Sequence, residues 1–160
     1  LLDDIARYQP DDAGLLLRRG MLLERMGRIE PALADMAAAA RLMPDDAMML
    51  NAYGYTLASH TSRLAEAHRL VRRALEREPD DPAILDSYGW ILYRQGSLAR
   101  ARSYLELAHA RLPDPEVAAH LGEVLWRQGE RERARRLWED ALQADPESQP
   151  LRDTMARFSR

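Results

Sequence analysis

The stretch PAILDSYGWILYRQGSLARARSYLELAHARLP at residues 82–113 predicts two consecutive helices. Within residues 82–94, side chains recur every three or four positions on one side of a helix: Leu85, Tyr88 and Leu92, with Gly89 on the same stripe. Residues 98–111 repeat this spacing with Ala101, Leu105 and Ala108, and Pro113 ends the segment. Small residues let two helices approach closely, so the stretch indicates an antiparallel helix pair.

The same pattern returns at a period near 34 residues along the whole chain. Four sets of markers carry the period: Pro10, Pro44, Pro79, Pro113 and Pro146; Gly20, Gly54, Gly89 and Gly122; Ala32, Ala67, Ala101 and Ala134; and Ala39, Ala74, Ala108 and Ala141. The second copy is one residue longer and lacks a glycine in its turn, a change that loops absorb at little cost.

These markers resemble those of tetratricopeptide repeat (TPR) proteins, whose 34-residue unit is a pair of helices closed by a proline. The resemblance implies an all-α fold, a right-handed superhelical α-solenoid of antiparallel helix pairs with about four units and a C-terminal capping helix. We expect a single TPR array over residues 1–160, divided into the tail of a preceding repeat at 1–10, repeats at 13–46, 47–81, 82–114 and 115–147, and a capping helix at 148–160. Leu151, Met155 and Phe158 are spaced to cover the last repeat.

The turns and linkers follow from local chemistry. Gly27, Gly96 and Gly129 stand where each first helix ends, and glycine supplies the left-handed conformation of such an end. The Asp residues of the linkers at 44–47 and 79–82 precede the next helix, where a carboxylate accepts backbone N–H bonds. We therefore interpret these acidic pairs as helix caps.

Composition narrows the classes of function. The chain has 26 acidic and 23 basic residues, a formal charge of −3, so it has no basic excess to neutralise nucleic-acid phosphates. Its 46% hydrophobic content includes only 6% aromatic residues, a mixture typical of helices. There is no cysteine, and no apolar run reaches the roughly 20 residues of a membrane-spanning helix.

Residues for catalysis or metal binding are few. The histidines form no His-x3-His pair, so we expect no metal site and no cofactor. His120 and Glu123 lie one helical turn apart, and we interpret them as a surface pair lining a groove, because no nucleophile or oxyanion donor accompanies them. The arginines of RERARRLW at 131–138 alternate with glutamates, which indicates a solvated outer face. We expect no catalytic residues and no enzyme activity.

A binding surface is predicted on the side of each first helix that faces away from its partner. First helices line the concave side of the TPR fold. The residues on that side are Met21, Glu24 and Arg25 in the first copy, Asn51 and Tyr55 in the second, Asp86, Trp90, Tyr93 and Arg94 in the third, and His120, Glu123, Trp126 and Arg127 in the fourth. Aromatic rings beside charged groups are typical of protein-binding surfaces, although each ring could instead wedge between neighbouring helices. The carboxylate clamp of chaperone-binding TPR domains is disfavoured, since Leu17 and Met21 stand where its Lys and Asn would be.

A narrower resemblance lies in LNAYGYTLASHTSRLAEA at 50–67, ILDSYGWILYRQG at 84–96, VAAHLGEVLWRQG at 117–129 and the closing LRDTMARF. These segments are similar to the C-terminal repeats of proteobacterial outer-membrane TPR lipoproteins, one of which is the adaptor of a periplasmic carboxyl-terminal processing protease. The resemblance implies a periplasmic scaffold, attached to the outer membrane through an N-terminal region not in this sequence. A cytoplasmic location is the alternative.

Two functions remain open. In the first, the chain is a scaffold or adaptor that binds a partner protein or peptide in the groove, including a periplasmic protease and its substrates, with no nucleic acid and no membrane insertion by this segment. In the second, it is a structural or self-associating segment with an empty groove.

Overall fold

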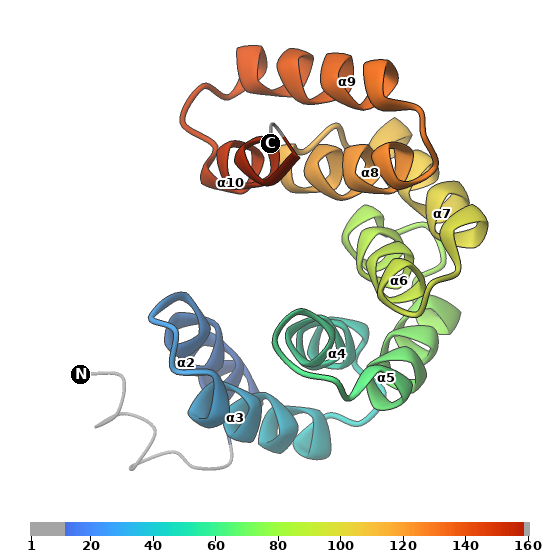
Figure 1. The fold of residues 1–160 in the computed structure, drawn as a ribbon. Helices are drawn as coiled ribbons and strands as arrows, with labels where there is room; N and C mark the ends of the chain where they lie inside the picture. The colour runs from blue at the N-terminus through green and yellow to red at the C-terminus, as the bar shows by residue number, and fades with distance from the viewer. Residues whose placement is uncertain (1–11, 159–160) are drawn as a thin grey trace. The chain divides into compact units, whose positions relative to one another are not determined.

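The computed structural model describes residues 12–158, and every regular element in that range is an α-helix (Figure 1). The helices are α2 (Ala13–Arg25), α3 (Ile29–Leu42), α4 (Ala47–His60), α5 (Leu64–Arg77), α6 (Pro82–Arg94), α7 (Leu98–Arg111), α8 (Pro115–Arg127), α9 (Arg131–Ala144) and α10 (Gln149–Phe158). The predicted helices at 82–94 and 98–111 are thus confirmed as α6 and α7. The all-α helical-repeat solenoid is also confirmed, whereas the predicted tail at 1–10 lies outside the described residues.

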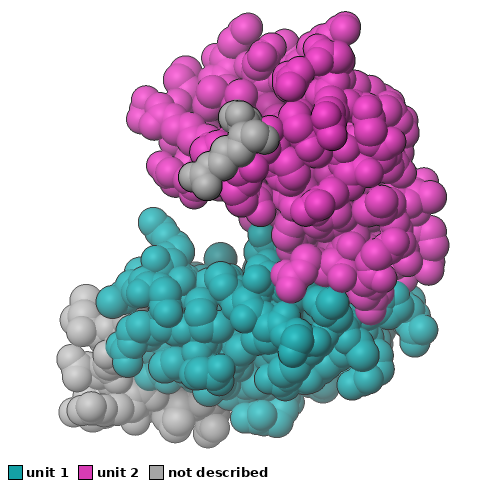
Figure 2. Space-filling view, viewed as in Figure 1, with its two compact units in different colours: residues 1–79 teal, residues 80–160 magenta. Residues whose placement is uncertain are grey.

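The chain divides into two compact units, residues 1–79 and 80–160 (Figure 2). Unit 1 contains the pairs α2/α3 and α4/α5, and unit 2 contains α6/α7, α8/α9 and the single helix α10. The division at 79/80 falls in the linker between α5 and α6, two residues before the end of the repeat predicted at 47–81, and the single array over 1–160 stays a prediction.

Each helix pair is closed by the same contact between a first-helix glycine and a large side chain of the second helix. A Cβ atom added to the glycine would lie within 3 Å of that side chain in all four pairs: Gly20 against Met36, Gly54 against Val71, Gly89 against Leu105, and Gly122 against Trp138. Trp138 is 2% exposed and therefore belongs to the core. The missing Cβ therefore sets how closely the two helices approach.

One residue before each of these contact residues, the pairs α2/α3 and α6/α7 use different chemistry at equivalent positions. In α2/α3, the guanidinium of Arg19 binds the carboxylate of Asp35 through two hydrogen bonds of 2.5 and 2.6 Å. In α6/α7, the rings of Tyr88 and Tyr104 meet edge to face with their centroids 4.8 Å apart. A bidentate ion pair and an aromatic pair thus fill the same place between two helices.

The predicted glycine turns are confirmed, and the caps are confirmed for one Asp of each acidic pair, while Asp45 and Asp80 instead form ion pairs with Arg77 and Arg111. Asp46 and Asp81 accept backbone N–H bonds of 2.9 Å from Met49 and Ile84, at the starts of α4 and α6. Gly27, Gly96 and Gly129 have φ values of 73°, 83° and 90°. These residues fix where each helix begins and ends.

The last helix, α10, packs against α8 and α9, as expected of a capping helix. Leu151 is fully buried, and Met155 and Phe158 are half-buried. Thr154 is also buried, although the sequence pattern had not singled it out. The helix therefore covers the apolar edge of the last pair.

The glycine contact can be tested with two Gly→Ala substitutions. A Cβ on Gly122 would lie 1.9 Å from Nε1 of Trp138, so we expect Gly122→Ala to lower the free energy of unfolding by about 1–3 kcal/mol. A Cβ on Gly14 in α2 would lie 3.4 Å from Asp12 Oδ1, an ordinary contact distance. Gly14→Ala should therefore raise the free energy of unfolding by about 0.4–1 kcal/mol. Urea denaturation measures both, and equal effects of the two substitutions would contradict the packing account.

Candidate functional site

The predicted groove residues of α6 and α8 lie against one another in unit 2. The Nδ1 atom of His120 is 3.0 Å from both carboxylate oxygens of Asp86. The ring of Trp90 stacks on the imidazole of His120, with centroids 4.2 Å apart and an interplanar angle of 20°. Side chains from two neighbouring first helices thus form one contact.

A second contact continues along the same helices. The hydroxyl of Tyr93 donates to Glu123 Oε1 at 2.7 Å, and Nε of Arg127 donates to the Tyr93 oxygen at 3.3 Å. The other Glu123 oxygen accepts a 2.9 Å bond from Nη2 of Arg157 on α10. Arg157 was not among the predicted site residues.

Three of these pairs, which we call the inter-repeat ladder, are separated by 34 residues: Asp86 with His120, Tyr93 with Arg127, and Glu123 with Arg157. Because 34 residues is one repeat, the two partners of a pair stand at equivalent places on successive first helices or on the cap. The ladder therefore joins α6, α8 and α10 into one row.

The ladder corrects part of the prediction. His120 and Glu123 are 8% and 5% exposed, so the expectation of a surface pair lining a groove was wrong. Asp86, expected on the outward side of α6, is 6% exposed. The wheel of a single helix shows which side faces away from its own partner, but it omits the helix of the next repeat, which covers that side here.

The burial and the hydrogen bonds of His120 and Tyr93 shift their pKa values. Burial alone lowers the pKa of His120, but the charge of Asp86 and its hydrogen bond outweigh burial, and the net pKa lies above the usual value of 6.5. The pKa of the Tyr93 hydroxyl is raised by burial and by its bond to Glu123. His120 therefore keeps its proton to a higher pH than an ordinary histidine does while it bonds to Asp86.

Trp126 lies in an aromatic cluster beside the cap. Its ring centroid is 5.8 Å from that of Trp138 and 5.5 Å from that of Phe158. The guanidinium carbons of Arg131 and Arg135 lie 5.4 and 5.2 Å from the Trp126 ring. The ring thus packs among α8, α9 and α10, which is the wedging alternative considered for each aromatic residue.

The remaining candidates differ in exposure. In unit 2, Arg94 and Arg127 are exposed, while Trp90 and Tyr93 are half-buried. In unit 1, Met21 and Arg25 are exposed, Asn51 and Tyr55 are half-buried, and the half-buried Glu24 lies 3.0 Å from Nε2 of His60. Binding at these positions stays a prediction.

Two polar atoms of this set are buried without a hydrogen-bond partner among the described residues, Asn51 Oδ1 and Trp90 Nε1. Each belongs to a side chain that is otherwise half-buried.

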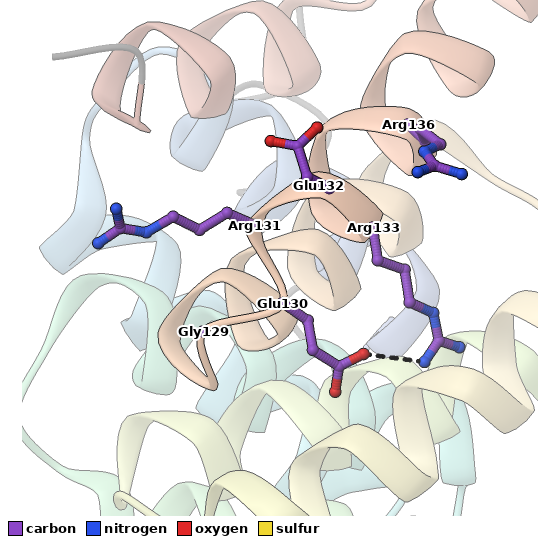
Figure 3. A pocket seen from close by; sticks show the side chains of 6 residues that line it. All are labelled: Gly129, Glu130, Arg131, Glu132, Arg133 and Arg136. Atoms are coloured by element: carbon purple, nitrogen blue, oxygen red, sulfur yellow. Dashed lines mark hydrogen bonds and ion pairs between the residues drawn. The ribbon is translucent and has the colours of Figure 1, made fainter.

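The start of α9 forms a surface hollow lined by Gly129, Glu130, Arg131, Glu132, Arg133 and Arg136 (Figure 3). Arg131 and Arg133 extend in different directions in this view, and Arg133 binds Glu130 at 3.2 Å. The arginines do not converge on one point, and the three charged residues at 131–133 are exposed. This arrangement agrees with the predicted solvated face.

Across residues 12–158, no three His, Asp or Glu side chains are grouped so that they could hold a metal ion. None of the helices in this range is both long and apolar enough to cross a membrane.

Comparison with known proteins finds matches to tetratricopeptide repeat proteins. Two family models, each described as a tetratricopeptide repeat, match residues 60–115 and 115–158. A TPR repeat-containing protein of Pseudomonas aeruginosa is 50% identical over 108 residues, which are 68% of this chain. Those residues cover 18% of that protein, so this chain spans only a small part of its relative.

Solved structures share the fold at low sequence identity. A TPR protein of Thermus thermophilus has a TM-score of 0.82 at 19% identity, covering 98% of this chain and 86% of that one. The Pseudomonas aeruginosa protein pilF has a TM-score of 0.71 at 20% identity, covering 92% and 69%. YrrB, described as a TPR protein with an unusual peptide-binding site, has a TM-score of 0.64 at 20% identity, covering 99% and 84%.

Stacked helix pairs of about 34 residues, joined by polar contacts between first helices, define a helical-repeat protein of the scaffold class. The two family models agree with the repeat markers of the sequence. The chain belongs to the tetratricopeptide repeat family, and neither matching model indicates a catalytic family.

The buried contact between His120 and Asp86 predicts how stability depends on pH. A histidine whose pKa is raised on folding stabilises the folded state below its unfolded pKa, about 6.5, and this contribution is lost as pH rises through the folded pKa. Asp86→Asn should remove that pH dependence and lower the free energy of unfolding at pH 6 by about 1.5–3 kcal/mol.

Urea unfolding of the wild type and of Asp86→Asn between pH 5.5 and 9 measures the effect. Asp140→Asn is the matched control, because Asp140 is exposed on α9. Parallel pH profiles for the wild type and Asp86→Asn would show that the pair does not couple protonation to folding.

Proposed function

We propose that the chain is a protein-interaction scaffold that binds a partner protein or peptide through the outward side of its first helices. TPR repeats generally serve as such scaffolds, and this proposal adds the surface that the chain uses. The partner contacts belong to the side chains that the inter-repeat ladder leaves accessible.

One observation carries the proposal. The half-buried amphipathic rings of Trp90 and Tyr93 lie on the same helix as the exposed Arg94. Arg127 is exposed on the next first helix. Rings offer contact area at little entropic cost, and guanidinium groups fix orientation by directed hydrogen bonds. The ladder holds Tyr93 in place before a partner arrives, which reduces the cost of ordering it on binding.

Similarity to solved TPR proteins supports a peptide as the partner. YrrB shares this fold and is described as having a peptide-binding site, although at 20% identity the likeness concerns the fold alone. The relative from Pseudomonas aeruginosa supports membership of the TPR family, but its name specifies no binding partner.

The proposal extends to location. The resemblance to outer-membrane TPR lipoproteins suggests that the protein containing this chain works in the periplasm and delivers substrates to a processing protease. Fractionation of a tagged full-length gene product tests the location directly, and recovery in the cytoplasmic fraction alone would contradict it.

Site-specific photo-crosslinking in the native host tests the binding surface. A photoreactive residue replacing Arg25 or Arg94, both exposed near the ends of first helices, should crosslink a partner protein. The same residue at Arg69 or Arg100, exposed on second helices, should give at least tenfold less of that product. Equal crosslinking from both sets of positions would contradict a first-helix binding surface.

Self-association is the second candidate, and one observation favours it. Leu22 is 39% exposed on α2, while Val124, at the equivalent position of α8, is fully buried. Met26 is also exposed, at 62%, directly after the same helix. An additional repeat or a second copy of this chain could cover this apolar surface.

Sedimentation velocity distinguishes the two candidates. If the α2 surface drives association, the wild type should form dimers as its concentration rises, and Leu22→Glu should remain monomeric because a buried unpaired carboxylate is costly. Arg18→Glu, an exposed change on the same helix, is the control. A wild type that stays monomeric at all concentrations would rule out self-association through this surface.

A further inference from the structure

Two arginines converge on one aromatic ring at the end of the inter-repeat ladder. The guanidinium carbon of Arg127 lies 5.8 Å from the Phe158 ring centroid, and that of Arg157 lies 5.6 Å from it. Arg127 also binds the Tyr93 hydroxyl, and Arg157 also binds Glu123, whose other oxygen accepts the hydrogen bond from Tyr93. These five residues form a closed ring of contacts, which we call the double-arginine cluster.

The charges of the cluster do not balance. It holds two guanidinium groups and one carboxylate, and that carboxylate, Glu123, is buried beneath them. Arg157 keeps 58% of its side chain exposed, and Arg127 is exposed as well. Since the buried carboxylate lies on the protein side, a net positive charge faces solvent.

The donors of Arg127 are only partly used. Its Nε donates to Tyr93, whereas no oxygen of the described residues accepts a bond from its two terminal nitrogens. A guanidinium presents parallel N–H groups that match the two oxygens of a carboxylate. Stacking on Phe158 and the bond to Tyr93 restrict the side chain, so less entropy is lost when a ligand binds.

We propose that the double-arginine cluster is a subsite for a carboxylate group of the bound partner, supplied either by an acidic side chain or by a chain terminus. The inference rests on the proposed function, because the carboxylate belongs to the protein or peptide held by the first helices. Arg127 makes the bidentate contact, and Arg157 adds a second charge beside it.

The surroundings favour an anion from a protein and not from nucleic acid. Beyond the cluster, Arg131 and Arg135 lie over Trp126, whose ring in turn contacts Phe158, and Arg135 is paired with Glu132. The positive charge is thus local to this end of unit 2, while the whole chain has a formal charge of −3. A nucleic acid would need an extended basic surface, whereas one carboxylate needs only one such cluster.

Binding of short labelled peptides to the full chain, followed by fluorescence anisotropy, tests the subsite. One probe is an amidated deca-glutamate, which carries side-chain carboxylates only, and another is a Gly-Ser decapeptide with a free carboxyl terminus. The amidated Gly-Ser peptide is the neutral reference. We expect at least one carboxylate probe to bind tenfold or more tightly than the reference, with affinity falling as salt rises, and the probe that binds identifies the source.

Arg127→Gln should weaken binding of that probe about tenfold or more, and Arg157→Gln should also weaken it. Arg100→Gln is the matched control, because it removes the same charge from an exposed position on α7. Arg157→Gln also breaks a contact between α10 and α8, so its unfolding midpoint is measured; Arg127→Gln leaves the Glu123–Arg157 bond in place.

Equal binding of all three peptides, no binding of either carboxylate probe, or an equal loss in Arg100→Gln and Arg127→Gln would overturn the subsite. Its failure is separable from failure of the proposed function. If one of those results overturns the subsite while Arg94 of the wild type still crosslinks a partner preferentially over Arg100, the scaffold is retained and only the carboxylate subsite is lost, whereas loss of preferential first-helix crosslinking in the wild type would remove both.

Discussion

The closeness of each helix pair depends on one steric constraint, the absence of a Cβ atom where a first helix crosses its partner. At Gly122 the space that a methyl group would need is taken by Trp138, and at Gly54 it is taken by Val71. The second helix can therefore vary the size of its side chain while the first helix keeps its glycine. With the pairs packed in this way, the opposite side of each first helix is available for contacts with other repeats or with partners.

The fold could be predicted from the sequence because its causes are local and periodic. A helix end in the left-handed conformation favours glycine, and an aspartate just before a helix supplies its cap. The roles of Gly96 and Asp81 could therefore be assigned from their residue types alone. Arg19 shows the limit of this reasoning. It occupies a position filled by tyrosine in α6, and its partner Asp35 becomes evident only when the two helices are superposed on a pair such as Tyr88 and Tyr104.

The candidate site was only partly predictable, because its geometry depends on a neighbour one repeat away. A helical wheel correctly separates Asp86 and His120 from the stripe that packs inside each pair, but it cannot show that these two side chains bury each other. The missing signal was present in the sequence as residues of opposite charge 34 positions apart. Applied to Glu123, that rule would also have found Arg157, the residue that connects the ladder to the cap.

The ladder gives the first helices of unit 2 two roles: its buried members hold neighbouring helices together, while its accessible arginines keep exposed guanidinium groups that a partner can contact. The most direct test is an NMR titration of the ¹⁵N-labelled chain with a partner fragment identified by crosslinking, observing the arginine Nε–Hε signals. The account predicts that the Arg127 and Arg157 signals shift with saturation while that of Arg100 stays in place. Shifts confined to arginines of the second helices, or spread evenly over all of them, would contradict it.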